Sequence, residues 1–252
     1  IPSPSPSNPA MDAAPRISRA PGKAKVADQL DPLSSIAGWR WEQITPGIRE
    51  NTVRGAAWSH DGQMAVGSGP LGVARWQHGV WYAISTANLR PGAVRGVSFW
   101  PNGDALLFGE GGLVFRISRG GLVEPWPFND PTVTFLAAHI DPNGAVCLVG
   151  EKGEATSSVA IATLFVEGKL TTFTTPKISR LNGVARLGPS DLIACGDLGM
   201  IARIESRGIE VIGAICSAKL NAIAAMPKGG ALTVGAGGHA LSLSSKLEPT
   251  LE

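Results

Sequence analysis

The chain has 252 residues, of which 44% are hydrophobic and 17% charged, and it contains 32 Gly. This composition favours a large core of packed sheets joined by short turns, and no apolar run approaches the ~20 residues that a membrane-spanning helix needs. A formal net charge of +2 and only 3 Cys exclude a field that would steer the whole molecule to nucleic acid, and they exclude a disulfide scaffold.

Residues 1–38 differ from the rest of the chain because they are rich in Pro, Ser and Ala and show no apolar period. Such a segment cannot bury enough apolar surface to offset the entropy lost on ordering. Alternating Pro and Ser favour an extended spacer, so we predict a linker over 1–38. The alternative is a fixed path along the surface of the folded part, with Leu30, Leu33 and Ile36 as contacts.

The rest of the chain repeats itself about every forty residues. Five times a run of small apolar residues reaches a turn, and a second apolar run then ends at a glycine that begins a Gly-x-Gly or Gly-x-x-Gly pattern. The closing glycines are Gly67, Gly109, Gly150, Gly196 and Gly235. A period of this size filled with short strands is typical of the blades of a β-propeller.

Four strands fit into one repeat. In the first unit they are expected over 53–59, 63–67, 73–77 and 80–85, and the second unit repeats this order, with strands that include 113–118 and 122–127. The Asp-Gly and Asn-Gly dipeptides supply the positive φ that tight hairpins need. The strands are apolar on both faces, as expected when each sheet lies between two neighbours.

The last unit differs because one strand, over 239–244, is followed only by the sequence KLEPTLE. We expect its missing outer strand to come from Trp39–Thr45, which would close a ring of five blades and hide the exposed edges. The fold class is therefore all-β, a five-bladed propeller over 39–247 with a tail at 248–252. The competing interpretation is a fragment of a larger ring.

Arginines and acids recur at fixed places in the repeat. An arginine ends the third strand and an acid directly follows the closing glycine in three units each: Arg75, Arg116 and Arg203, and Glu110, Glu151 and Asp197. Buried arginines are costly unless they are paired, so these acids are expected to be their partners. The alternatives are a structural lattice of ion pairs between blades and a polar ring that captures an acidic group or a chain terminus.

All seven tryptophans precede residue 127. Trp100 and Trp126 lie at strand ends beside prolines and are expected to be able to reach a ligand, because aromatic residues are enriched in binding centres. Arg90 lies in a connection between blades and belongs to the same predicted recognition face, together with Arg49, Asp130 and Arg180.

Catalytic and metal-binding patterns are weak. His60, His78, His139 and His239 lie in four different units without metal-ligand spacing. The Gly-rich turns lack the Lys-Ser/Thr pair of a phosphate-binding loop. We therefore expect no catalytic site, no metal and no cofactor.

The pattern of small apolar strand, Asp-Gly or Asn-Gly turn, apolar run, Gly-x-Gly and Arg resembles the degenerate bacterial propeller repeats of the photosystem II assembly factor type and, more loosely, WD-like propellers. The Ser-x-Asp-x-Gly-x-Thr-Trp box of that group is absent, and Ser59-His60-Asp61-Gly62 is the nearest match. The resemblance implies a rigid binding platform, of the kind that follows Pro-rich linkers as a sensor or interaction domain of bacterial signalling proteins.

The prediction is therefore a monomeric, non-catalytic recognition or scaffold module that binds a protein or peptide, with no nucleic-acid partner and no membrane insertion by this segment. The alternatives are a lectin-like propeller that binds carbohydrate and a glycoside hydrolase-like enzyme with two facing carboxylates. The compartment is not determined by the sequence, although the extracytoplasmic side is favoured.

Overall fold

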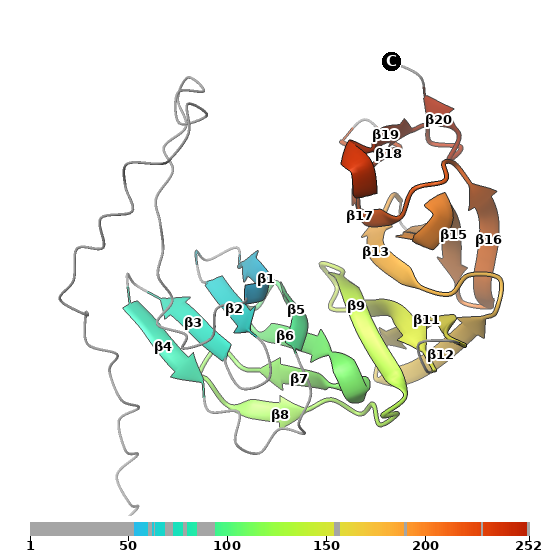
Figure 1. The fold of residues 1–252 in the computed structure, drawn as a ribbon. Helices are drawn as coiled ribbons and strands as arrows, with labels where there is room; N and C mark the ends of the chain where they lie inside the picture. The colour runs from blue at the N-terminus through green and yellow to red at the C-terminus, as the bar shows by residue number, and fades with distance from the viewer. Residues whose placement is uncertain are drawn as a thin grey trace, which may run out of the picture.

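The structure is a computed structural model, and it describes residues 53–59, 62, 64–68, 73–77, 80–84, 94–153, 157–188, 191–227 and 229–250. These residues form five four-stranded antiparallel sheets (Figure 1). No helix in this part of the chain is long and apolar enough to cross a membrane.

Each sheet is built from four strands that are consecutive in the sequence. The first sheet contains β1 (Val53–Trp58), β2 (Met64–Ser68), β3 (Val73–Gln77) and β4 (Val80–Ile84). The second contains β5 (Val94–Phe99), β6 (Ala105–Gly109), β7 (Val114–Ile117) and β8 (Val123–Pro125). The third contains β9 (Val133–Ile140), β10 (Val146–Lys152), β11 (Val159–Val166) and β12 (Lys169–Thr175). The fourth contains β13 (Leu181–Arg186), β14 (Leu192–Gly196), β15 (Met200–Glu205) and β16 (Gly208–Ala214). The fifth contains β17 (Leu220–Ala225), β18 (Ala231–Gly235), β19 (Ala240–Leu243) and β20 (Pro249–Thr250).

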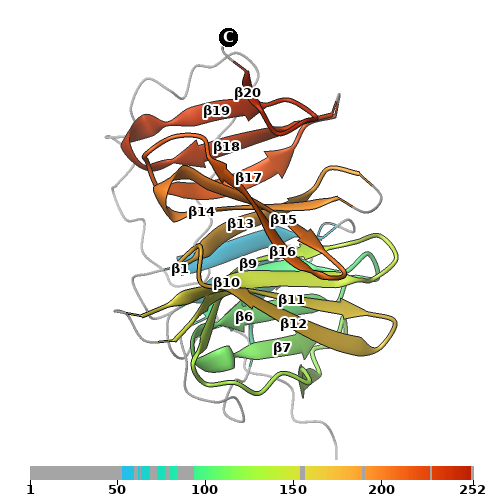
Figure 2. The same cartoon turned by 90° about the vertical axis from the view of Figure 1, so that its right-hand side faces the viewer.

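The five sheets follow one another along an arc. Consecutive first strands are in contact, β1 with β5, β5 with β9, β9 with β13 and β13 with β17. The first and fifth sheets lie at the two ends of the arc (Figure 1), and the view turned by 90° shows the sheets layered one on another (Figure 2). This arrangement confirms the coarser part of the predicted fold class, an all-β, propeller-like fold of four-stranded antiparallel sheets.

The turn after the closing glycine explains why glycines recur there. Short 3-10 turns follow β6, β14 and β18, namely η3 (Glu110–Gly112), η4 (Asp197–Gly199) and η5 (Ala236–Gly238). A Cβ at Gly112 would lie 2.2 Å from the carbonyl oxygen of Asp130, and one at Gly199 would lie 2.0 Å from that of Cys216. Only glycine permits this close approach of the chain that connects to the next sheet.

The core lies between the sheets. Side chains of the third sheet, including Val149 and Ala162, form one buried cluster with Val184, Ala194 and Ala202 of the fourth sheet. Every residue of β6 and of β14 is buried. These two strands are therefore covered on both faces, as their apolar sequences predicted.

The prediction that the fifth sheet lacks its own outer strand was wrong. β20 pairs with β19 through Ser242 with Thr250 and Leu243 with Pro249, and it lies within the segment 248–252 that was assigned to a tail. A tight turn makes this possible, because Leu247 has φ 66 and the amide of Ser244 donates to the carbonyl of Glu248 at 2.8 Å. Trp39–Thr45, the strand expected at this edge, lies outside the described residues.

Candidate functional site

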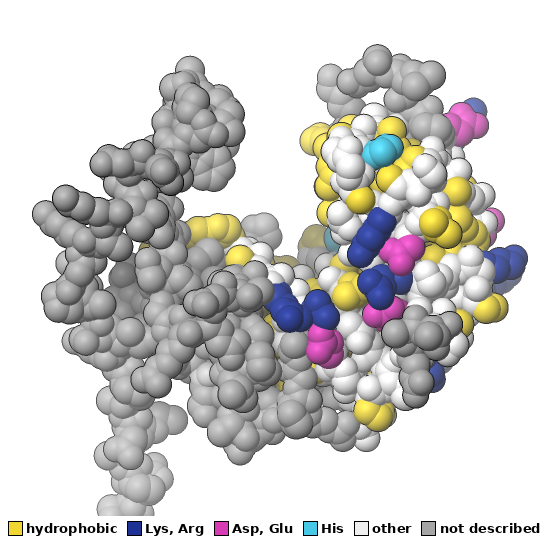
Figure 3. Space-filling model, in the orientation of Figure 1, with side chains coloured by type: hydrophobic (Ala, Val, Ile, Leu, Met, Phe, Trp, Pro, Cys, Tyr) yellow, Lys and Arg dark blue, Asp and Glu magenta, His cyan; other side chains and the backbone are white. Residues whose placement is uncertain are grey.

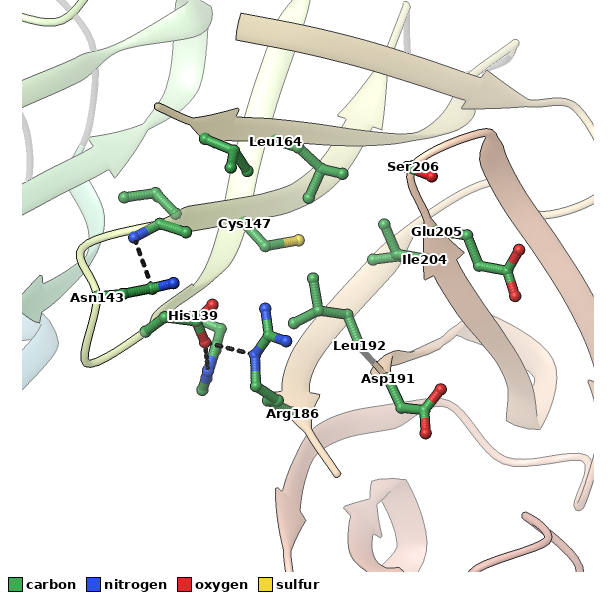
Figure 4. A pocket seen from close by; sticks show the side chains of 14 residues that line it. His139, Asn143, Cys147, Leu164, Arg186, Asp191, Leu192, Ile204, Glu205 and Ser206 are labelled. Carbon is green, nitrogen blue, oxygen red and sulfur yellow. Dashed lines mark hydrogen bonds and ion pairs between the residues drawn. The ribbon is translucent and has the colours of Figure 1, made fainter. Parts of the chain in front are cut away.

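A cleft of about 490 Å³ opens between the third and fourth sheets (Figure 4). Its lining comes from β9, β10 and β11 on one side and from the ends of β13, β14 and β15 on the other. Its volume falls within the range of small-molecule sites in proteins. A second cavity, lined in part by Asp191 and Arg203, measures about 110 Å³.

The pairing of the strands determines which side chains line the cleft. In the third sheet, His139 pairs with Cys147 and Cys147 pairs with Leu164. In the fourth sheet, Leu192 pairs with both Arg186 and Ile204. Directly opposite residues of paired strands project to the same face, so each trio forms one row. The two rows line the cleft together, next to the closed core of small side chains.

His139, Asp141 and Arg186 form a connected polar group on one wall. His139 Nε2 lies 3.0 Å from Asp141 Oδ1, and the same oxygen forms an ion pair with Arg186 Nε. The side chain of Asp141 is only 8% exposed, whereas those of His139 and Arg186 are 28% and 22% exposed. A nearly buried carboxylate thus holds two side chains that can still be reached from the cleft (Figure 4).

The environment favours a neutral imidazole at His139. Burial lowers the pKa of His139 below its ordinary value of 6.5, and nearby Arg186 lowers it further, although the hydrogen bond and charge of Asp141 oppose the shift. When Nε2–H donates to Asp141, the lone pair of Nδ1 remains available. His139 therefore has the protonation state that a general base requires.

Cys147 lies beside this group but is not suited to nucleophilic chemistry. Burial raises the pKa of its thiol to about 12, and only the thiolate is strongly nucleophilic. Within the described residues, no group of three or more His, Cys, Asp or Glu side chains is arranged to hold a metal ion. The polar group of His139, Asp141 and Arg186 can support acid–base chemistry.

The acids that follow the closing glycines do not pair with the third-strand arginines, so that prediction was wrong. Glu110 pairs with Arg95 and lies 3.3 Å from Arg54, Glu151 lies 2.8 Å from Arg180, and Asp197 accepts a hydrogen bond from Asn182 at 2.9 Å. These partners lie in or just before a first strand. Figure 3 shows basic and acidic side chains side by side along the inner rim of the arc.

The three arginines find partners nearer the other end of their sheets. Arg75 donates to the carbonyl of Ser118 at 3.3 Å, Arg116 pairs with Asp104, and Arg203 lies 3.2 Å from Glu210. The arginines pair with the second residue of the second strand, whereas the acids lie at or just after its far end. Their side chains therefore point to different ends of the sheet.

The two candidate tryptophans pack between the second and third sheets. Trp100 is 8% exposed and its Nε1–H donates to the carbonyl of Gly144 at 3.2 Å. Trp126 stacks on Trp100 with ring centroids 5.2 Å apart and meets the ring of Phe165 at 4.6 Å. Packing thus accounts for both rings. Arg90 and Arg49 of the predicted recognition face lie outside the described residues.

Sequence reasoning missed the cleft. His139 was considered only as a metal ligand, and its partner Asp141 lies two residues further along the chain. The spacing His-x-Asp at the end of a first strand was the available signal. No sequence pattern indicated Arg186 as a site residue, because only the approach of two sheets brings it to Asp141.

No family model and no curated protein matches the sequence. The fold, however, matches solved structures of lyases. Virginiamycin B lyase from Staphylococcus aureus is 13% identical, with 79% of this chain and 68% of the lyase covered and a TM-score of 0.65. A catalytically inactive variant of that lyase, in which alanine replaces a histidine and which was solved with quinupristin, gives the same values. A streptogramin B lyase is 14% identical, with 81% and 83% covered and a TM-score of 0.52.

This finding corrects the predicted function. The expectation of a non-catalytic recognition module for a protein or peptide, and of no enzymatic activity, was wrong, because the matched solved structures named above, which share this fold, are lyases. The physical reason is that repeat patterns report how sheets pack and carry no information about a cleft between two of them. At 13% and 14% identity the likeness itself shows the fold.

Proposed function

We propose that the chain is an enzyme that carries out acid–base chemistry on a small organic molecule bound between the third and fourth sheets. The observation that carries the proposal is the group formed by His139, Asp141 and Arg186 on the wall of the cleft. A base oriented by a carboxylate, beside a cation, is a recurrent arrangement in proton-transfer enzymes. The lyase neighbours of this fold, one of which loses activity when a histidine is replaced, favour the same class.

The proposed reaction is a lyase-type elimination. Nδ1 of neutral His139 removes a proton from a carbon of the substrate, the C–H electron pair forms a new double bond, and the leaving group departs with the electrons of its own bond. Asp141 positions the imidazole and stabilises the imidazolium that forms. Arg186, whose guanidinium faces the cleft (Figure 4), stabilises the negative charge that develops on the substrate. No water or redox partner enters this step.

Replacement of His139 tests the proposal. The chain is incubated with quinupristin and with a set of small linear and cyclic esters that carry a C–H bond next to the carbonyl, and conversion is followed by mass spectrometry. We expect at least one compound to be converted, and His139→Ala to lower the rate about 100-fold or more. His239→Ala is the matched control, because His239 is exposed in the fifth sheet.

Two outcomes would contradict the proposal. The first is that no compound of the set is converted. The second is that the His139→Ala and His239→Ala variants convert the same compound at the same rate. The masses of the products also report the class, because an elimination adds no water whereas a hydrolysis does.

We further propose that each sheet is one blade and that the five blades close into a ring within one chain. The contacts between consecutive first strands support the blade assignment. Where the fourth and fifth sheets meet, Gly183 lies against Ala222. Closure of the ring would bring the exposed face of the fifth sheet, at β17, against β1 of the first sheet in the same way. A cysteine pair at Ala56 and Ala222, both exposed, tests this, since a short crosslinker joins them within one chain only if the ring closes.

A further inference from the structure

We propose that the molecule bound in the cleft carries a positive charge at one end of an apolar body, with the reacting group at the other end. This inference rests on the proposed function, because it names the substrate class of the same cleft. It follows from the distribution of apolar and charged side chains over the lining. The experiment below measures binding, so its result does not depend on turnover.

The middle of the cleft is apolar. Leu164 and Cys147 of the third sheet lie opposite Leu192 and Ile204 of the fourth (Figure 4), and Val166, which is 45% exposed, extends the same surface outward. These side chains offer a ligand no hydrogen bonds. An apolar body fills such a surface best, because binding then removes apolar area from water on both partners.

The charge of the lining is unbalanced. Arg186 is the only lysine or arginine that lines the cleft, and its charge is matched by the ion pair with Asp141. Two further carboxylates, Asp191 and Glu205, also line it. Neither has a basic partner within the described part of the chain. With His139 neutral, the lining carries more formal negative than positive charge.

The unpaired carboxylates lie apart from the histidine. Figure 4 shows Glu205 and Asp191 on the side of the fourth sheet, while His139 and Asn143 lie on the side of the third, with Cys147 and Leu192 between them. Ser206, next to Glu205, adds a hydroxyl at the same edge. A cation held by these two acids would therefore place its apolar body across the cleft and its far end near His139.

An anionic ligand fits this arrangement less well. Its carboxylate or phosphate would have to displace Asp141 from Arg186 or share the guanidinium with it, and Asp141 is nearly buried. It would also be repelled by Asp191 and Glu205, which line the cleft. A positively charged ligand meets neither cost, and its approach is favoured by the same two carboxylates.

Three dansyl amides that differ only at the end of a short alkyl chain test the proposal. The chain ends in an amine, a methyl group or a carboxylate, and dissociation constants are measured by fluorescence at low and high salt. We expect the amine to bind about tenfold more tightly than the carboxylate at low salt. The preference should shrink in high salt, because the two acids are exposed to solvent.

The double variant Asp191→Asn/Glu205→Gln locates the effect. It should remove most of the preference for the amine. The control Glu124→Gln/Glu248→Gln removes the same formal charge at exposed positions of the second and fifth sheets and should leave the preference unchanged. The proposal is overturned if the carboxylate probe binds as tightly as the amine, if none of the three probes binds, or if both double variants behave alike.

The failure of this inference can be told apart from the failure of the proposed function. His139→Ala should abolish conversion yet keep the preference for the amine. A clear preference for the amine without conversion of any ester supports the substrate class and rejects the enzyme. Conversion of an ester without charge preference supports the enzyme and rejects the class.

Discussion

The fourth and fifth sheets use similar sequences but bury them differently. β14 (LIACG) and β18 (ALTVG) occupy the same position in the repeat, directly before a closing 3-10 turn. Every residue of β14 is buried, whereas burial alternates along β18 and leaves Leu232 44% and Val234 42% exposed. The second face of a strand is thus buried only when another sheet covers it.

The exposed face of the fifth sheet is continuous. Ala222, Val234 and Ala240 form one cross-strand row, and Ala224 and Leu232 belong to the next. All five residues are exposed. In the other sheets, such rows of small side chains lie where two first strands approach each other closely. The approach of Gly183 to Ala222 is an example. The comparison therefore separates the effect of the strand's own sequence on burial from the effect of a neighbouring sheet.

A charge placed in each of the two strands should produce the largest difference. Ile193→Asp puts an unpaired carboxylate into a fully buried position of β14, which we expect to cost about 4 kcal/mol or more of unfolding free energy. Leu232→Asp lies on the face of β18 that is exposed in the open arc, so it should stay within about 1 kcal/mol if the arc stays open and should cost several kcal/mol if the ring closes as proposed. Urea denaturation followed by circular dichroism measures both. Equal and severe losses would mean that a further sheet covers β18.

Matched glycine substitutions should give the next largest difference. Gly199 and Gly238 end the turns η4 and η5, with φ 68 and φ 77. A Cβ at Gly199 would lie 2.0 Å from the carbonyl oxygen of Cys216, whereas one at Gly238 meets nothing within 4 Å. Gly238→Ala should therefore cost only the positive φ, about 1 kcal/mol, and Gly199→Ala about 3 kcal/mol. Similar midpoints of thermal unfolding in the two variants would refute this explanation.

Acid should weaken the junction of the second and third sheets, where Asp130 forms an ion pair with Lys152. Among the described residues, no ion pair involves the fifth sheet, so acid should have no comparable effect there. A hydrogen bond from Lys152, at 2.8 Å, and others from Thr132 lower the pKa of Asp130 from 3.8 to about 2. The pair therefore stabilises the folded state above about pH 3.8, and this contribution is lost as the pH falls toward 2. Because Lys152 is 43% exposed, we expect about 1 kcal/mol.

Asp130→Asn checks this pH dependence. The variant should be about 1 kcal/mol less stable than the wild type at pH 7 and equally stable near pH 2, as measured by urea denaturation at each pH. Glu248→Gln, an exposed acid of the fifth sheet, is the control and should follow the wild type throughout. A loss that persists unchanged at pH 2 would show that Asn disturbs the connection sterically.

The repeat predicted the strands well because their signals are local. The expected strand over 73–77 matches β3, and the expected strands at 122–127 and 239–244 enclose β8 and β19. β20 was missed because two residues are too few to show a period, and the turn before it places Leu247 rather than a glycine at positive φ. The boundary of the linker at residue 38 stays a prediction.

The candidate site was harder to predict because it depends on register between strands and on contact between sheets. The bulge between Val149 and Gly150 changes the register of β9 against β10, and a shift of one residue would turn His139 to the opposite face. Asp141 follows the first strand of the third sheet, and Arg186 ends the first strand of the fourth. The forty-residue repeat makes these two sheets equivalent and gives no sign that these residues form an ion pair. Neither fact can be read from spacing along the chain.

The smallest effect should be a change in the pKa of His139, which lies at the junction of the third and fourth sheets. The exposed face of the fifth sheet forms no corresponding junction with another described sheet. Asp141 favours the charged imidazole and Arg186 opposes it. Asp141→Asn should therefore lower the pKa of His139 further, whereas Arg186→Gln should raise it. Nuclear magnetic resonance follows the imidazole signal against pH, with His139→Gln to assign it. Shifts in the same direction in both variants would mean that a general change in burial outweighs the two charges. Opposite shifts would show that His139 responds to charges from both sheets, one on each side of the cleft.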